Sequence, residues 1–315
     1  MVIRRGIPAR AGQPIALTIG NFDGVHLGHQ AMLKRLREAA CAQACPAAAL
    51  TFEPHPREFF APDQAPVRLT SMREKFELLR SFGVERIHVC RFNFEFARIS
   101  PEDFVARVLQ RGLAVRWLLV GDDFRFGARR AGDFALLKAL APAHGFEVCA
   151  MQSVSVDGQR VSSTAVREAL GGGALDTAER LLGRPYSISG RVVQGDQLGR
   201  RIGFPTANVQ MKHNRPPLFG IFAVEVSGIG ETPRRGVASL GVRPTVKARG
   251  QPTLEVHLFD FDADIYRRHV RVAFLHKLRE EEKYADIETL TRQIALDVDN
   301  AKEFFHRQDT REMRG

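Results

Sequence analysis

Short apolar runs alternate with helical patterns along the first half of this 315-residue chain. Between the runs, apolar residues recur at the three- and four-residue spacing of amphipathic helices. Two of these helices are expected to begin near Ser71 and Ser100 and to end near Gly83 and Gly112. This alternation predicts an α/β domain, a Rossmann-like parallel sheet with helices on both faces, which binds ligands at the carboxyl ends of its strands. The expected strands cover residues 15–18, 47–52, 86–89, 115–120 and 146–150.

The pattern changes in the second half, after two short expected helices at 163–170 and 175–182. Short strand-like runs are then separated by Gly, Pro and charged turns, and the final segment, 287–305, has a helical apolar stripe. Closely spaced strands followed by one helix predict a small antiparallel β-barrel with a terminal helix. We therefore expect two domains, residues 1–183 and 184–310. The expected barrel strands cover 187–193, 222–226, 237–240, 253–259 and 270–275.

Charge and cysteine usage change this picture only slightly. The net charge of +10 suggests an anionic partner, but the basic residues form separated doublets without an RNA-binding aromatic signature, so we expect no nucleic acid partner. The four cysteines form no CxxC pair, which fits a reducing compartment. No apolar run reaches membrane-spanning length and no signal peptide is visible, so we expect a cytoplasmic protein without a membrane partner. A weak homo-oligomer stays open.

Residues 18–29, Thr-Ile-Gly-Asn-Phe-Asp-Gly-Val-His-Leu-Gly-His, join an expected strand to an expected helix through a glycine-rich turn. His26 and His29 stand three positions apart at the start of that helix, where backbone N–H groups are also available. Both features suit a phosphate. Gly20 and Gly28 permit a close approach of the backbone to a ligand. A histidine in so short a motif can also cap or pack the helix, and that alternative stays open.

Two further segments bring polar side chains to the ends of expected elements. Residues 120–127 follow the strand at 115–120, so their acidic side chains emerge at its carboxyl end, unless they form a plain acidic turn. Residues 161–167 begin a helix, where hydroxyl and N–H groups suit an anion but also explain simple N-capping. The polar side chains of the two segments are Asp122, Asp123, Arg125, Ser162, Ser163, Thr164 and Arg167.

Taken in order, the motifs at 20–29, 52–56, 121–127 and 162–167 resemble the bacterial FAD synthetases, within the nucleotidyltransferase superfamily related to class I tRNA synthetases. The resemblance implies that a phosphate of FMN attacks the α-phosphorus of ATP and that pyrophosphate leaves, a reaction driven by positioning and charge neutralisation. It implies catalytic roles for His26 and His29 at the α-phosphate and for Arg167 at the departing phosphates. The ATP-binding residues that it implies are Gly20, Asn21, Phe22, Asp23, Gly28, Asp123, Ser162, Ser163 and Thr164.

The second half carries its own glycine-rich basic loop within residues 190–208, and this loop lacks the Walker A pattern. The loop ends in Pro-Thr-Ala-Asn, where Thr206 and Asn208 offer neutral oxygens of the kind that suit Mg²⁺, although a proline-started β-turn explains the same residues. Glu255 lies on the polar face of an expected strand whose other face is apolar. A carboxylate there could accept the proton of a substrate hydroxyl, or it could simply be solvated.

The segments at 203–209, 218–224, 239–245, 255–262 and 278–284 are, in this order, similar to the riboflavin kinases. That resemblance implies that ATP phosphorylates riboflavin to FMN, with Glu255 as the base that activates the ribityl hydroxyl. It implies that Thr206 and Asn208 hold Mg²⁺ and that Gly195, Gly203 and Thr206 bind ATP.

The chain departs from the riboflavin kinase pattern at two positions. Arg267 stands where these kinases usually have glycine, and Phe222 stands where they usually have tyrosine. Both positions lie outside the expected catalytic set, so the departures put local turn geometry in doubt more than activity.

Together the two halves predict a bifunctional enzyme of flavin cofactor synthesis, with riboflavin, FMN and ATP as small-molecule partners and FAD as the final product. Three alternatives stay open: an enzyme with one degenerate site, a nucleotidyltransferase for another phosphorylated substrate, and a non-enzymatic regulator that binds RNA or senses flavin. Steeply salt-dependent RNA binding without ATP turnover would favour the regulator. Whether FMN passes directly between the sites is not visible in the sequence.

Overall fold

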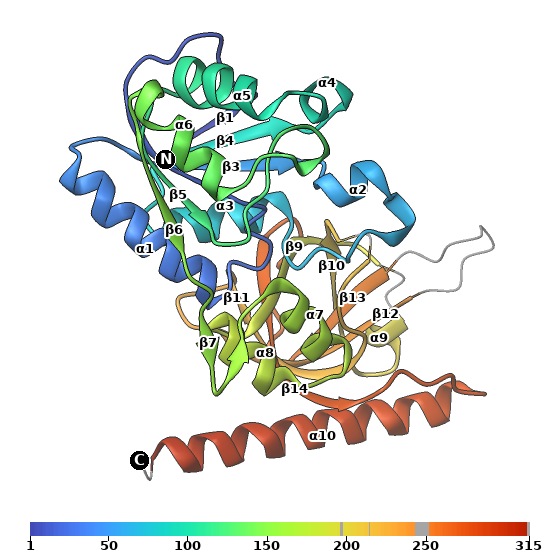
Figure 1. The fold of residues 1–315 in the computed structure, drawn as a ribbon. Coiled ribbons are helices and arrows are strands. Elements are labelled where there is room, and N and C mark those ends of the chain that lie inside the picture. Colours follow the sequence, from blue (N-terminus) through green and yellow to red (C-terminus); the bar gives the residue numbers. More distant parts are fainter. Residues whose placement is uncertain (196–197, 214, 243–251, 314–315) are drawn as a thin grey trace. The chain divides into compact units, whose positions relative to one another are not determined.

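The computed structural model describes residues 1–195, 198–213, 215–242 and 252–313. The chain forms two compact units (Figure 1). The first unit contains residues 1–66 and 72–163, and the second contains residues 67–71 and the chain from Thr164 onward. Helix α8 (Leu175–Leu182) and all but the first residue of α7 (Ser163–Gly171) therefore count with the second unit. The domain boundary at residue 183 stays a prediction.

A six-stranded parallel sheet forms the centre of the first unit, and this confirms the predicted α/β architecture. All five predicted strands are present, within one or two residues of their expected ends. An additional edge strand, β1, was not predicted because its four residues are all exposed and show no alternation. In sheet order the strands are β1 (Val2–Arg5), β4 (Arg86–Arg91), β3 (Ala47–Glu53), β2 (Ile15–Ile19), β5 (Val115–Gly121) and β6 (Glu147–Met151).

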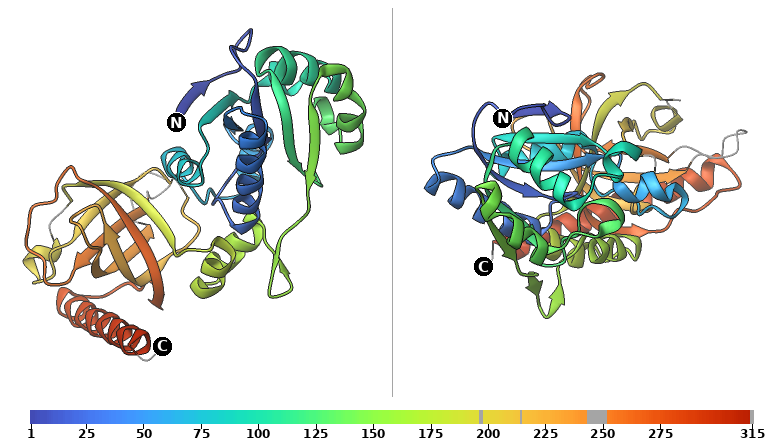
Figure 2. Two further views of the ribbon diagram at one scale, coloured as in Figure 1. Left: turned by 90° about the vertical axis from the view of Figure 1, so that its left-hand side faces the viewer. Right: turned by 45° about the horizontal axis from the view of Figure 1, so that its top comes forward.

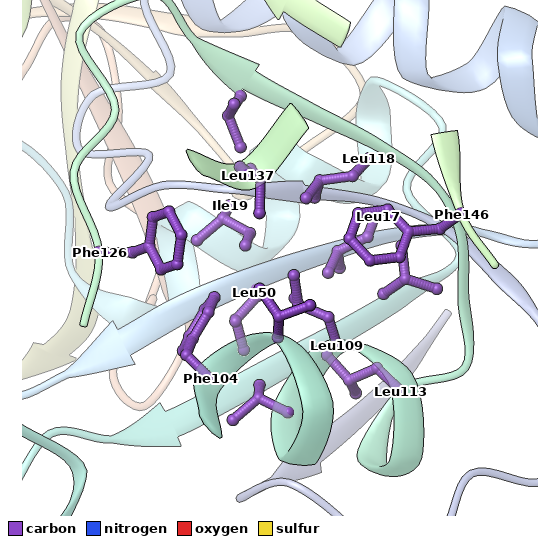
Figure 3. Packing of buried hydrophobic residues seen from close by; sticks show 14 of the residues in the cluster. Leu17, Ile19, Leu50, Phe104, Leu109, Leu113, Leu118, Phe126, Leu137 and Phe146 are labelled. Atoms are coloured by element: carbon purple, nitrogen blue, oxygen red, sulfur yellow. The ribbon is translucent and has the colours of Figure 1, made fainter. Parts of the chain in front are cut away.

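Helices cover both faces of this sheet (Figure 2). On one face, Leu33 and Leu36 of α1 (Leu27–Ala42) and Leu79 of α3 (Met72–Ser81) are buried against the strands. On the other face, Phe104 and Leu109 of the π-helix η2 (Phe104–Gly112) point toward the sheet (Figure 3). The shorter elements are α2 (Pro56–Phe60), η1 (Pro62–Gln64), α4 (Phe94–Ala97), α5 (Pro101–Asp103), η3 (Ala128–Arg130), α6 (Phe134–Leu140), η4 (Pro142–His144), β7 (Ser155–Val156) and β8 (Gln159–Arg160).

The second unit is built around a closed antiparallel barrel, which confirms the predicted small β-barrel. The long terminal helix α10 (Ile287–Glu312) extends past its predicted end and packs against three barrel strands. Val298 and Ala301 from its apolar stripe are buried together with Phe305. In barrel order the strands are β10 (Ala207–Met211), β13 (Pro252–Leu258), β12 (Arg234–Val242), β11 (Gly220–Ser227), β14 (His269–Arg279) and β9 (Tyr186–Val193).

Strand β10 was not among the predicted strands. The Pro-Thr-Ala-Asn sequence was open to interpretation as a turn, but Ala207 and Asn208 begin a strand that pairs with β9 and β13. Only one of its five residues, Val209, is buried, so β10 lacks the alternation that marks a strand in the sequence. None of the helices among the described residues is long and apolar enough to cross a membrane.

Candidate active sites

Two stacked histidines occupy the start of α1 in the first unit. Between β2 and α1 the chain turns sharply, and Phe22 and Val25 take left-handed backbone angles, with φ of 48° and 42°. His26 is the N-cap of α1, because its Nδ1 accepts a hydrogen bond from the His29 N–H at 3.3 Å. The two imidazole rings stack with centroids 3.7 Å apart and planes 18° apart. The cap that the sequence left as an alternative is thus present, and it pairs the two rings.

The surroundings of His29 favour its neutral form. Burial lowers its pKa well below the ordinary value, and the nearby His26 and Lys75 lower the pKa further. Among the described residues, the buried Nδ1 of His29 has no hydrogen-bond partner. The same holds for the buried Oδ1 of Asn21, in the same turn. Two unsatisfied buried polar atoms in one turn favour a ligand that supplies their hydrogen bonds.

The glycines of this turn leave room for rings of the protein itself. A Cβ on Gly28 would lie 3.2 Å from the His26 ring, and a Cβ on Gly20 would lie 3.2 Å from the Phe22 ring. Phe22 is fully buried and tilts against the His29 ring at a centroid distance of 5.2 Å. The rings that contact His29 therefore pack closely on these glycines, and the approach of a ligand at Gly20 and Gly28 stays a prediction.

The remaining predicted residues of this half lie in several places. The Ser163 hydroxyl donates to the Asp23 carbonyl at 2.8 Å within the first unit, so this hydroxyl already has an internal partner. Ser162 is half-buried and Thr164 is exposed. The carboxylate of Asp123 lies in the loop after β5, where it forms an exposed ion pair with Arg160 at 3.1 Å.

An aromatic cluster, which the sequence motifs did not predict, lies at the carboxyl ends of β3 and β4. Phe59 contacts the Phe94 ring edge-to-face at 4.8 Å and the Phe92 ring at 5.5 Å. Phe60 and Phe94 are 65% and 69% exposed, which is unusual for side chains of this size. In the sequence, the many phenylalanines between residues 52 and 104 could have indicated this cluster. Exposed ring faces and edges suit a flat aromatic ligand.

The predicted kinase residues Asn208 and Glu255 lie directly opposite each other in the barrel. Asn208 of β10 pairs in register with Glu255 of β13, and Glu255 pairs on its other side with Ser239 of β12. Leu254 and Val256 are buried on one face of β13, so Glu255 lies on the other face, as the alternation predicted. The register therefore aligns the amide of Asn208, the carboxylate of Glu255 and the hydroxyl of Ser239 on three neighbouring strands.

The glycine-rich loop packs onto these polar side chains. A Cβ on Gly195 would overlap the side-chain amide of Asn208, and a Cβ on Gly199 would overlap the Phe204 carbonyl. Gly203 has a left-handed φ of +88°. The next residues are held by a hydrogen bond of 2.9 Å between a ring nitrogen of His257 and the Pro205 carbonyl. The close packing explains why glycines are needed here.

A cavity of about 260 Å³ opens beside Glu255. Apolar side chains of the barrel, of α10 and of the segment before β10 line part of it, and polar or charged side chains line the rest. The polar and charged side chains are Thr206, Ser239, Glu255, His257, Arg279, Glu281, Glu282, Tyr284 and Asp297. An apolar pocket with a few converging polar groups is typical of a small-molecule site. The apolar side chains are Ile202, Phe204, Ile221, Val237, Ala238, Leu290 and Ile294.

A largely buried ion pair also lines this cavity. Arg279 donates two hydrogen bonds to Asp297 of α10, at 2.8 and 2.6 Å, and this pairing raises the pKa of the guanidinium. The guanidinium also lies 5.8 Å from the centre of the Tyr284 ring. These contacts fix the position of α10 against β14 at the cavity.

The two departures from the riboflavin kinase pattern have clear structural settings. Arg267 adopts φ of +66°, the left-handed conformation that glycine takes without strain, and its N–H donates to the Val192 carbonyl at 2.9 Å. Phe222 is fully buried and packs edge-to-face on Phe274 at 5.2 Å. Residues 243–245 of the motif at 239–245 lie outside the described residues.

Comparisons with known proteins agree with the two predicted activities. The FAD synthetase family matches residues 9–165 and the riboflavin kinase family matches residues 182–305. Over 308 residues the chain is 48% identical to a bifunctional riboflavin kinase/FMN adenylyltransferase of Escherichia coli, covering 97% of this chain and 98% of that protein. It is 50% identical over 285 residues to a protein of the same description from Pseudomonas fluorescens, covering 90% and 91% of the two chains.

A solved structure has the same overall fold. This structure, described as a macrolide-efflux protein from Streptococcus pneumoniae, superposes with a TM-score of 0.81 at 27% identity, over 94% of this chain and 97% of that one. The two family matches together span most of the sequence, and the identity to the curated relatives extends over nearly its full length. The chain therefore belongs to the family of bifunctional riboflavin kinases/FMN adenylyltransferases.

Proposed function

We propose that the chain has two activities and that each activity has its own set of catalytic groups. The chain phosphorylates riboflavin to FMN with ATP, and it transfers the adenylyl group of a second ATP to FMN, which gives FAD and pyrophosphate. The observation that carries the assignment is the separation of two polar clusters. The stacked pair of His26 and His29 lies in the first unit, whereas Asn208 faces Glu255 in the barrel of the second.

In adenylyl transfer, a phosphate oxygen of FMN attacks the α-phosphorus of ATP while the bond to pyrophosphate breaks. The transition state gathers negative charge on the α-phosphate oxygens, and the start of α1 offers backbone N–H groups and the positive end of the helix dipole there. The neutral, buried His29 needs no solvent reorganisation to hydrogen-bond such an oxygen. Loss of one such donor costs roughly 3 kcal/mol, or about a hundredfold in rate.

The other ATP contacts of this reaction are proposed from the family motifs. Thr164, Ser163 and Arg167 hold the departing phosphates. The exposed aromatic cluster around Phe59 and Phe94 stacks on the isoalloxazine ring of FMN. The unsatisfied Asn21 Oδ1 supports an ATP contact in the turn after β2. The full proposed ATP set of this half is Gly20, Asn21, Phe22, Asp23, Gly28, Asp123, Ser162, Ser163 and Thr164.

In riboflavin phosphorylation, Glu255 accepts the proton of the terminal ribityl hydroxyl as that oxygen attacks the γ-phosphorus and ADP leaves. The cavity beside Glu255 has the apolar wall and polar rim that a flavin needs. Gly195 and Gly203 shape the loop that binds ATP, and Thr206 contacts the nucleotide. The fixed register between the strands of Asn208 and Glu255 positions the base relative to this loop.

The residues around Asn208 fit a magnesium ion. Thr206 offers a hydroxyl and Asn208 an amide oxygen, which are hard oxygen ligands of the kind that Mg²⁺ accepts. Among the described residues, no group of three or more acidic, histidine or cysteine side chains could hold a metal. Mg²⁺ here would therefore take its other ligands from water and ATP phosphates, as it commonly does. Bound there, it would neutralise phosphate charge during the transfer.

We propose a cytoplasmic enzyme whose partners are its small-molecule substrates. The four cysteines are free thiols, which fits a reducing compartment. The basic residues are dispersed along the chain, as on an ordinary solvated surface. We therefore propose no nucleic acid or membrane partner. A weak homo-oligomer stays open.

Two single substitutions test the division of labour. His29→Ala should slow FAD formation from FMN about a hundredfold and leave FMN formation from riboflavin at its wild-type rate. Glu255→Gln should stop FMN formation and leave FAD formation from supplied FMN intact. Chromatography of the flavin products measures both reactions. Loss of both activities in either folded variant would contradict the proposal.

A further inference from the structure

A short segment, residues 67–71, groups with the second unit although the residues on either side of it belong to the first, and its last three residues are buried. We call this segment the strap. Two of its backbone carbonyls accept hydrogen bonds from side chains of the second unit. The Nε of Arg167 donates to the Val67 carbonyl at 2.6 Å, and the Tyr186 hydroxyl donates to the Leu69 carbonyl at 3.0 Å.

Tyr186 is itself held by the core of the barrel. It is the first residue of β9, is buried, and pairs in register with Phe274 of β14. The two rings stack at a centroid distance of 6.2 Å, and Phe274 packs edge-to-face on Phe222. A hydroxyl on a ring packed in the barrel core gives the Leu69 carbonyl a well-positioned partner.

We propose that Tyr186 is a positioning residue for adenylyl transfer, and that it acts through the strap on the guanidinium of Arg167. The proposal rests on the proposed role of Arg167 at the departing phosphates. The Tyr186 hydroxyl fixes the strap at Leu69, the strap fixes the Val67 carbonyl two residues earlier, and that carbonyl holds the Nε of Arg167.

The physical benefit is pre-organisation. An arginine side chain has many rotamers, and ordering it when a phosphate binds costs free energy. A guanidinium already held at its Nε loses less freedom at that step. The barrel core therefore contributes to FAD formation even though its own reaction is the phosphorylation of riboflavin.

Tyr186→Phe tests the proposal, because it keeps the ring and removes only the hydroxyl. We expect kcat for FAD formation at saturating FMN and ATP to fall about tenfold, the effect of one buried hydrogen bond, with riboflavin phosphorylation unchanged. Phosphorylation in the same sample reports that the barrel is folded. Tyr266→Phe is the matched control, because it removes the hydroxyl of a well-exposed ring in the same unit and should change neither activity.

A double-mutant cycle separates positioning from general support of the structure. If Tyr186 acts through Arg167, Tyr186→Phe should cause no further loss of kcat in an Arg167→Ala background. A further tenfold loss there, or a joint loss of riboflavin phosphorylation in Tyr186→Phe, would overturn the proposal. Unchanged FAD formation in Arg167→Ala would overturn the role of Arg167 and the proposal with it. A loss in Arg167→Ala without a loss in Tyr186→Phe would overturn the proposal for Tyr186 alone.

Discussion

Two arginine–aspartate pairs join α10 to the barrel with nearly the same geometry but different burial. Arg279 binds Asp297 through hydrogen bonds of 2.8 and 2.6 Å, and Arg235 binds Asp309 through bonds of 2.7 and 2.6 Å. The side chain of Asp297 is 4% exposed and that of Asp309 is 43% exposed. Burial should therefore decide what each pair contributes to stability.

Asp297→Asn should lower the free energy of unfolding of the second unit by about 3 kcal/mol. Removing one partner of a buried pair typically costs 3–5 kcal/mol, since the other charge stays buried without its counterion. The lower end of this energy range applies here, because the Arg279 side chain is 19% exposed and keeps a hydrogen bond to the Glu280 carbonyl. Asp309→Asn should cost clearly less, because water solvates both members of the exposed pair.

Urea unfolding of the full chain, followed by circular dichroism, measures both variants. Trp117, the single tryptophan, lies in β5 of the first unit, so its fluorescence transition provides an internal reference that neither substitution should shift. An Asp297→Asn variant no less stable than Asp309→Asn would refute the argument from burial.

Three further predictions concern single residues. Arg267→Gly should raise the free energy of unfolding by about 1 kcal/mol, because this backbone is left-handed, and a lower melting temperature would contradict that. Gly195→Ala should abolish riboflavin phosphorylation, since its Cβ would displace the Asn208 amide, whereas Gly230→Ala has open space and should keep the wild-type rate; equal rates would contradict the packing. Below about pH 6.5 the protein should lose stability, because the unfolded chain binds a proton at His29 that the folded chain, with its lowered pKa, does not. His29→Gln should reduce this slope in urea titrations by up to about 1.4 kcal/mol per pH unit, and an unchanged slope would argue against a buried neutral imidazole.

The sequence predicted those elements whose burial leaves a local pattern, either a continuous apolar run such as β2 or an alternation between core and solvent. The β13 pattern of Leu254, Val256 and Leu258 is a clear case, and all three are buried. Edge strand β1 and strand β10 were missed, because β1 buries none of its residues and β10 buries only Val209. Both are held as strands by pairing with strands that are distant in the sequence, and a local pattern does not carry that information.

The candidate sites were predictable as sets of residues but not as geometry. The motifs named Asn208 and Glu255, yet their direct opposition depends on the register between β10 and β13, which are more than forty residues apart. The stack of His26 on His29 depends on left-handed backbone at Phe22 and Val25, which propensity disfavours. The proposed role of residues 67–71 depends on hydrogen bonds from Arg167 and Tyr186, which lie at least 100 residues later in the sequence.

The central claim is that two separate sites act in sequence on one flavin. The most direct test supplies riboflavin, ATP and Mg²⁺ to His29→Ala, to Glu255→Gln and to an equal mixture of the two, and follows the flavins by chromatography. We expect the first variant to accumulate FMN, the second to leave riboflavin unchanged, and the mixture to make FAD. FAD formation from riboflavin at the wild-type rate by either variant alone, or a mixture that accumulates FMN without FAD, would contradict this claim.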